Sequence, residues 1–139
     1  MFTRFSMLLA VVATLLASGV AVADDAAKPA ITNTIQSQLS ALQKDDFEQA
    51  FTYASPMIKR MFGSPANFGA MVSQGYPMVH RPSDVRFLEL REVAGALYQK
   101  VQVRDASGRI HFLDYQMIEI ENGWKINGVQ LLKTSELSA

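Results

Sequence analysis

The stretch that decides the fold is VRFLELREVAGALYQKVQVRDASGRIHFLDYQMIEIENGWKINGVQLLK, residues 85–133. Apolar and polar residues alternate along it with a period close to two, which is typical of β-strands with one buried face. Turn sequences divide it into four runs, and the clearest of them is Asn122-Gly123, which favours a two-residue hairpin loop. The spacing predicts a four-stranded antiparallel meander with strands near 85–93, 96–105, 109–121 and 124–133.

Helical spacing replaces this alternation upstream of the meander. Apolar residues recur every three or four positions over 31–42, which predicts an amphipathic helix. DFEQ at 46–49 matches a capping box, and Ser-Pro at 55–56 and at 64–65 each places an N-cap residue before a first-turn proline. A loop is expected over 76–82. The fold class is therefore α+β, with three to four N-terminal helices packed on a bent four-stranded antiparallel sheet.

The N-terminal 23 residues are typical of a secretory signal peptide. One positive charge precedes an uncharged apolar run, which ends in Ala21-Val22-Ala23 before the next charge. An uncleaved anchor helix is the alternative, because the run approaches the length that spans a bilayer. We predict cleavage after Ala23, with no stable membrane anchor afterwards. The expected organisation is a signal peptide at 1–23, a flexible leader at 24–30, one α+β domain at 31–133 and a C-terminal tail at 134–139.

The charge and cysteine content limit the cellular compartments and the classes of partner that fit this chain. The chain has 13 Lys and Arg against 13 Asp and Glu, so loss of Arg4 with the signal leaves 12 minus 13, a net charge of −1. A nearly neutral chain lacks the excess of basic residues that proteins use to bind nucleic acid. The absence of Cys excludes thiol chemistry and Cys-based metal sites, and it means that the core alone must hold the fold. We expect an exported, periplasmic protein with no nucleic-acid partner.

The turns also predict a register for the meander. In that register Lys100 stands between Glu89 and Asp114, and opposite charges across strands favour this pairing on an outer face. The outer face of the last two strands carries a cluster of apolar residues. An exposed apolar patch often marks a protein interface, so we predict a homodimer that forms through this face. The candidate interface residues are Ile110, Phe112, Ile118, Ile120, Val129 and Leu131.

Three polar residues fall in one row on the inner, apolar face of the predicted sheet: Gln99, Tyr115 and Gln130. Buried polar groups need hydrogen-bond partners and can supply them to a ligand. These residues are therefore the candidate ligand site. The alternative is that they satisfy one another within a plain core.

Several stretches carry a resemblance to a known family. They are FEQAFTYASP (47–56), MFGSPANFGAMVSQGYP (61–77), the Arg81-Pro82 pair, DYQM (114–117) and GWKINGV (123–129). Together they resemble the bacterial exported family catalogued as domain of unknown function 4864. Helices followed by a bent sheet resemble the nuclear transport factor 2-like, or cystatin-like, fold. That resemblance implies a cone-shaped cavity between sheet and helices, which serves catalysis in some relatives and binding in others.

The leading functional expectation is a non-catalytic periplasmic binding or accessory protein for a small, mainly apolar ligand. Only two histidines are present and no metal-ligand spacing occurs, so we expect no metal and no cofactor. Methionine and phenylalanine concentrate in the helical half, as suits an adaptable lid over an apolar ligand. They are Met57, Met61, Met71, Met78, Phe47, Phe51, Phe62 and Phe68.

Two other functions stay open. An enzyme of the isomerase or dehydratase type would use Tyr115 as hydrogen-bond donor with Glu119 or His111 as base, although the sequence favours a protein that is not an enzyme. A protein-interaction module would use the outer face of the sheet.

Overall fold

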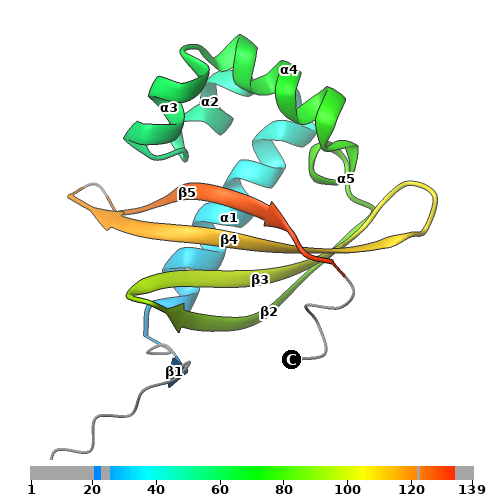
Figure 1. The fold of residues 1–139 in the computed structure, drawn as a ribbon. Coiled ribbons are helices and arrows are strands. Elements are labelled where there is room, and N and C mark those ends of the chain that lie inside the picture. Colours follow the sequence, from blue (N-terminus) through cyan, green and yellow to red (C-terminus); the bar gives the residue numbers. More distant parts are fainter. Residues whose placement is uncertain (1–20, 23–25, 122, 134–139) are drawn as a thin grey trace, which may run out of the picture.

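The computed structural model describes residues 21–22, 26–121 and 123–133. Most of the expected signal peptide, its cleavage site after Ala23 and the expected tail at 134–139 lie outside these ranges. The described helices are α1 (Lys28–Gln43), α2 (Phe47–Thr52), α3 (Pro56–Phe62), α4 (Pro65–Gly75) and α5 (Pro77–His80). The strands are β1 (Ala21–Val22), β2 (Asp84–Val93), β3 (Ala96–Arg104), β4 (Ile110–Ile120) and β5 (Gly123–Leu131). The predicted α+β class is confirmed (Figure 1).

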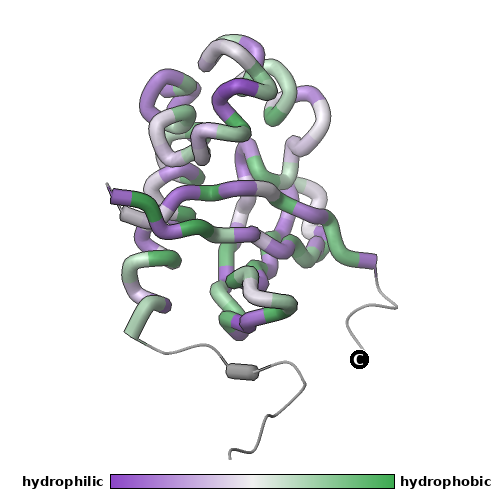
Figure 2. The backbone as a smooth tube through the Cα atoms, turned by 60° about the vertical axis from the view of Figure 1, so that its left-hand side comes forward, coloured by the Kyte–Doolittle hydropathy of each residue, from purple (hydrophilic) through white to green (hydrophobic). Residues whose placement is uncertain are grey.

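The sheet has the strand order β1-β2-β3-β4-β5, and every neighbouring pair is antiparallel. Strands β2 to β5 form the predicted four-stranded meander, and the sheet does not close. The two residues of β1 add to the free edge of β2, where Ala21 pairs with Glu92 and Val22 with Arg91. Figure 2 shows hydrophilic and hydrophobic residues alternating along the strands, as expected when one face of a sheet is buried.

The helices begin where their capping residues predict. The side chains of Asp46, Ser55 and Ser64 each accept a hydrogen bond from a backbone N–H in the first turn of α2, α3 and α4. Two boundaries differ from the prediction. Helix α1 begins at Lys28, so the end of the expected leader is helical, because Pro29 is tolerated in a first turn. The expected loop at 76–82 contains the short helix α5, which also starts at a proline.

The core lies between α1 and the inner face of the sheet. Helix α1 crosses the strands, while α2, α3 and α4 gather beyond β5 (Figure 1). Ile31, Ile35, Leu39 and Leu42 of α1 are buried, as their spacing predicts. They belong to one cluster with the buried strand residues Leu90, Val101, Val103, Leu113 and Met117.

The predicted register is correct between β3 and β4 but wrong between β4 and β5. Lys100 pairs with Asp114 and Gln99 with Tyr115, as expected. At the last hairpin, however, Ile120 pairs with Gly123, a residue that the prediction placed in the loop. Gly123 takes a φ of 106°, which non-glycine residues rarely adopt, and this explains why glycine closes the turn.

The charged residues predicted to pair across the outer face, Glu89, Lys100 and Asp114, do lie there, but only one of the two expected ion pairs forms. Lys100 Nζ lies 2.8 Å from a Glu89 carboxylate oxygen, but Asp114 is bound by Arg91. The guanidinium donates to both carboxylate oxygens, at 3.1 and 2.6 Å. Such a two-point contact has the geometry that Arg favours with a carboxylate.

Candidate functional site

A pocket lies between the helices and the β5 end of the sheet. Its volume is about 360 Å³, within the range of small-molecule sites. We call it the α3–β5 pocket. Its lining residues are Gln38, Leu42, Ala54, Ile58, Met61, Phe62, Phe68, Met71, Val72, Tyr76, Val79, Ile126, Gly128 and Val129.

Helix α3 forms the outer wall of this pocket. Its start is fixed by the Ser55 cap, and it ends at Gly63, which adopts a left-handed φ of 80°. Ile58, Met61 and Phe62 line the pocket because residues spaced three and four apart share one helix face. No residue of α3 itself is buried. Helix α3 therefore covers a hollow, and its Phe62 packs against the core cluster without being buried in it.

Aromatic contacts hold the wall that α4 contributes. The rings of Phe62 and Phe68 meet edge to face with centroids 5.8 Å apart, and Phe51 lies 5.6 Å from Phe68 in a tilted arrangement. Both distances are in the favourable range for aromatic pairs. Phe68 thus connects α2, α3 and α4 around the pocket.

A β-bulge in β5 turns Val129 toward the pocket. The pairing shifts by one residue between Gln116 and Met117 of β4, so β5 accommodates an extra residue at Asn127. The shift places Val129 opposite the buried Tyr115 and therefore on the inner face. Val129 lines the pocket and is 38% exposed, which places it at the mouth.

Hydrogen bonds tie this bulge to the start of α3. Ser55 Oγ donates to Asn127 Oδ1 at 2.8 Å, and Asn127 Nδ2 donates to Gln116 Oε1 at 3.3 Å. The Ser55 N–H also donates to the Ile126 carbonyl at 2.8 Å. Because Ser55 is fully buried, these bonds are shielded from water. They fix the position of the outer wall relative to β5.

Polar side chains are sparse in the pocket. Among its lining residues in the described part of the chain, only Gln38 and Tyr76 have them. Gln38 donates its amide N–H to the Ala50 carbonyl at 3.2 Å. Its amide oxygen accepts no hydrogen bond within the described ranges and has the chemistry to accept one from a ligand. A mostly apolar wall with few polar groups is typical of sites for small apolar molecules.

The three candidate ligand residues do not form a site together. Gln99 and Tyr115 are cross-strand neighbours and both are completely buried, as expected. Gln130, in contrast, pairs with Asp114 on the outer face and is exposed, because the bulge at Asn127 reverses the direction of the residues after it. None of the three lines the α3–β5 pocket.

Gln99 has a structural role at a second bulge, where β2 shifts register between Phe87 and Leu90. Its amide nitrogen donates to the carbonyls of Leu88 and Lys100, both at 2.9 Å. Lys28 Nζ donates to the same Leu88 carbonyl at 2.8 Å. The Leu88 oxygen, which the bulge removes from the regular ladder, therefore has two donors.

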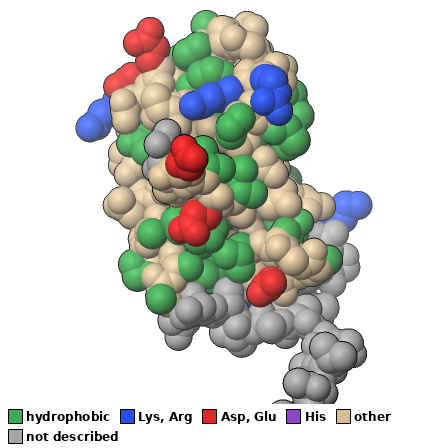
Figure 3. All heavy atoms as spheres, turned by 90° about the vertical axis from the view of Figure 1, so that its left-hand side faces the viewer, with side chains coloured by type: hydrophobic (Ala, Val, Ile, Leu, Met, Phe, Trp, Pro, Cys, Tyr) green, Lys and Arg blue, Asp and Glu red, His purple; other side chains and the backbone are tan. Residues whose placement is uncertain are grey.

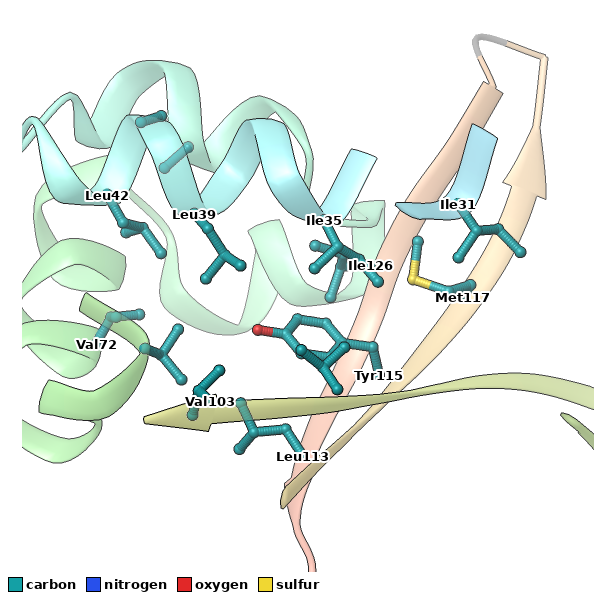
Figure 4. Packing of buried hydrophobic residues seen from close by; sticks show 14 of the residues in the cluster. Ile31, Ile35, Leu39, Leu42, Val72, Val103, Leu113, Tyr115, Met117 and Ile126 are labelled. Carbon is teal, nitrogen blue, oxygen red and sulfur yellow. The ribbon is translucent and has the colours of Figure 1, made fainter. Parts of the chain in front are cut away.

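Tyr115 points from β4 toward α1 and lies among Ile35, Leu39 and Ile126 (Figure 4). Burial raises the pKa of its phenol well above the ordinary value of 10. Neither the Tyr115 hydroxyl nor the Gln99 amide oxygen has a hydrogen-bond partner within the described ranges. Both oxygens are enclosed, so they do not face the pocket as the prediction required.

The geometry does not bring together the residues of the isomerase alternative. His111 and Glu119 each lie four residues from Tyr115 along β4, about 13 Å at the usual rise of a strand. His111 Nε2 is held by Asp105 Oδ2 at 2.8 Å, and Glu119 is exposed. Acid–base transfer needs hydrogen-bond reach or one bridging water. No group of three or more potential metal ligands occurs in the described part of the chain.

The bulge also divides the candidate interface. Ile110, Phe112, Ile118 and Ile120 lie on the outer face of β4, whereas Val129 and Leu131 pair with the inner-face residues Tyr115 and Leu113. Placing Val129 and Leu131 on the outer face was therefore wrong. The Arg91–Asp114 pair stands between the two ends of the remaining apolar strip.

A comparison with family models now identifies the chain. The model of the domain of unknown function DUF4864 matches residues 24–139. The chain belongs to the DUF4864 family. No curated protein and no solved structure matches it.

Sequence reasoning missed the pocket of this DUF4864 domain because it placed the ligand site in the sheet. Met61, Met71, Phe62 and Phe68, four of the eight Met and Phe residues assigned to a lid, do line it. Val129 was missed because the register was taken from the turn alone. Asn127-Gly128 was the available signal, since a glycine inside a strand often marks a bulge.

Proposed function

We propose that this DUF4864 domain is a non-catalytic periplasmic protein that binds a small, mainly apolar molecule in the α3–β5 pocket. The observation that carries the proposal is the pocket itself, with about 360 Å³ of space and a predominantly apolar lining. Helix α3 is suited to act as an adaptable lid over the pocket. Its flexible Met57 and Met61 side chains are 44% and 65% exposed.

Export rests on the N-terminal sequence. The family match begins at residue 24, directly after the expected cleavage site, which supports a mature domain that starts there. Within the described ranges, no helix has the length and hydropathy that a membrane crossing requires. The intact mass of protein from the periplasmic fraction should correspond to a chain that begins at Asp24, and a mass that retains residues 1–23 would contradict cleavage.

The arrangement of helices over one face of a bent antiparallel sheet also supports a nuclear transport factor 2-like cone. In that interpretation the α3–β5 pocket is the cavity at the β5 side of the cone. An experimental structure compared with known members of that fold would test this assignment.

Binding can be tested with Nile red, an uncharged dye whose fluorescence rises in apolar surroundings. Titration of the mature protein should give saturable fluorescence, and Val129→Trp should weaken binding at least about ten-fold because it fills the mouth of an apolar pocket. Val93→Trp is the matched control: Val93 is also a 38% exposed valine on a strand, and it lies outside the pocket.

Circular dichroism and thermal unfolding would show that both variants fold. If the wild-type protein gives no saturable signal at micromolar concentration, or if the two variants lose binding equally, the proposed pocket function is wrong.

A homodimer through the outer face of β4 is the second proposal, and it would also suit an interaction module. Ile110, Phe112, Ile118 and Ile120 support it, because apolar residues on an exposed sheet face often mark an interface. Sizing chromatography with light scattering should give twice the monomer mass. Phe112→Asp with Ile120→Asp should convert the protein to a monomer, whereas a monomeric wild-type protein at micromolar concentration would refute the dimer.

A further inference from the structure

Charged residues are distributed unevenly around the α3–β5 pocket. Helices α3 and α4 and strand β5 carry three charged side chains, Lys59, Arg60 and Lys125, and all three are cations. The chain as a whole has equal numbers of acidic and basic residues. Taken together, α3, α4 and β5, three of the five elements that line the pocket, therefore carry cations and no acidic residue.

Among the described residues, these three cations form no ion pair with a carboxylate. Arg81, Arg86, Arg91 and Lys100 each form an ion pair. In the described part of the chain, Lys59 and Arg60 form none, and Lys125 donates only to the Thr52 carbonyl, at 3.0 Å. Figure 3 views the end of the molecule that carries α3: Lys and Arg side chains lie among hydrophobic ones in its upper part, and acidic side chains lie at its upper left and near its centre. An external anion near α3 would therefore not compete with a protein carboxylate for Lys59 and Arg60.

The apolar lining continues from the pocket onto the surface. Met61 of α3 and Val129 of β5 line the pocket and remain 65% and 38% exposed. Met57 and Leu131, on the same two elements, are 44% and 45% exposed. A ligand that filled only the interior would leave this rim in water, whereas a longer ligand would cover it.

From these observations we propose that the ligand is a single-chain amphiphile with an anionic head group. Its hydrocarbon chain occupies the α3–β5 pocket and crosses the apolar rim. Its head group stays at the surface beside α3, whose two charged residues, Lys59 and Arg60, are both cations and lie outside the face that lines the pocket. This inference rests on the proposed function, because it specifies the chemical class of the ligand for the same pocket.

Displacement of Nile red by matched ten-carbon probes tests the head group. Decanoate, decanol and decyltrimethylammonium share the chain and differ in charge, and each is used below its micelle concentration. Decanoate should bind about three- to ten-fold more tightly than decanol, since exposed charge pairs contribute modestly. The cationic probe should bind more weakly than decanol, and acetate, a head group without the chain, should not displace the dye.

Variants on α3 test the position of the head group. Lys59→Gln with Arg60→Gln should remove the advantage of decanoate over decanol while decanol binds as before. The matched control is Arg104→Gln with Arg109→Gln. It removes two exposed arginines at the β3–β4 hairpin, at the opposite end of the sheet from α3 (Figure 1). This control should keep the advantage, and added salt should reduce it in the wild-type protein.

The outcomes separate the two proposals. Equal affinity for decanoate and decanol, or equal losses in the two double variants, would overturn the anionic ligand and leave apolar binding intact. Failure of every ten-carbon probe to displace the dye would also overturn it. If Nile red itself does not bind, the proposed function fails, and the inference that rests on it falls as well.

Discussion

Val129 of β5 lies directly opposite Tyr115 of β4. This pairing places a half-exposed valine at the mouth of a pocket and moves Gln130 to the opposite face of the sheet. A shift of one residue is sufficient, because successive side chains of a strand point to opposite faces. The bulge at Asn127 therefore determines both where the pocket opens and which residues surround it.

The link between α3 and the bulge predicts unequal effects of two serine substitutions. Ser55 caps α3 and also donates to Asn127, whereas Ser64 caps α4 alone. Ser64→Ala should lower the free energy of unfolding by about 1 kcal/mol, the usual contribution of a cap. Ser55→Ala should lower it by about 2 kcal/mol, because it also leaves the Asn127 oxygen without a donor. Urea unfolding of both variants measures the difference, and equal losses would exclude a stabilising role for the link.

The close approach of α2 and α4 predicts a steric effect at Gly69. A Cβ atom there would lie 2.3 Å from the ring of Phe47. Gly69→Ala should therefore destabilise the protein by about 1–3 kcal/mol, as overpacking usually does. Gly75→Ala is the matched control on the same helix, because nothing lies within 4 Å of its Cβ position. It should be neutral or slightly stabilising, since alanine favours helix. A neutral Gly69→Ala would mean that the Phe47 ring moves freely.

Local patterns predicted much of this fold, and the errors have a common cause. Caps at Asp46, Ser55 and Ser64 and the hairpins around β3 depend on neighbouring residues, which the sequence displays directly. The register of β5 depends on hydrogen bonds from Ser55, more than seventy positions upstream of Asn127, which no local pattern shows. The pocket was missed for the same reason, because its walls come from α1, α3, α4, α5 and β5. Packing between distant segments decides such features.

The Arg91–Asp114 pair predicts strong coupling between its two residues. The side chains are only 21% and 9% exposed, so loss of one partner leaves a poorly solvated charge. Arg91→Met or Asp114→Leu alone should each cost about 3 kcal/mol of unfolding free energy. The double variant should recover most of that loss, because no unpaired charge remains. A double-mutant cycle by urea unfolding measures this coupling, and additive losses would show that the pair acts as two independent surface charges.

The hairpin between β3 and β4 predicts a pH-dependent contribution from Asp105. Hydrogen bonds from His111 and the Ser107 hydroxyl, together with the N–H groups of Arg109 and Ser107, hold the pKa of the Asp105 carboxyl well below its usual value of 3.8. A carboxyl whose pKa is lower in the folded chain stabilises it above the unfolded value, and that stabilisation is lost as pH falls through the folded value. Asp105→Asn removes the charge and keeps one of the two acceptor oxygens, while an NH2 group replaces the other. It should lower the melting temperature at pH 7, and the difference in melting temperature from the wild-type protein should narrow as pH falls from about 5 toward 2.

The control is Glu119→Gln, which removes an exposed carboxylate with no ion pair in the described part of the chain. It should change the melting temperature little at any pH. A gap that stays constant from pH 7 to pH 2 would show that the Asp105 charge does not stabilise the hairpin.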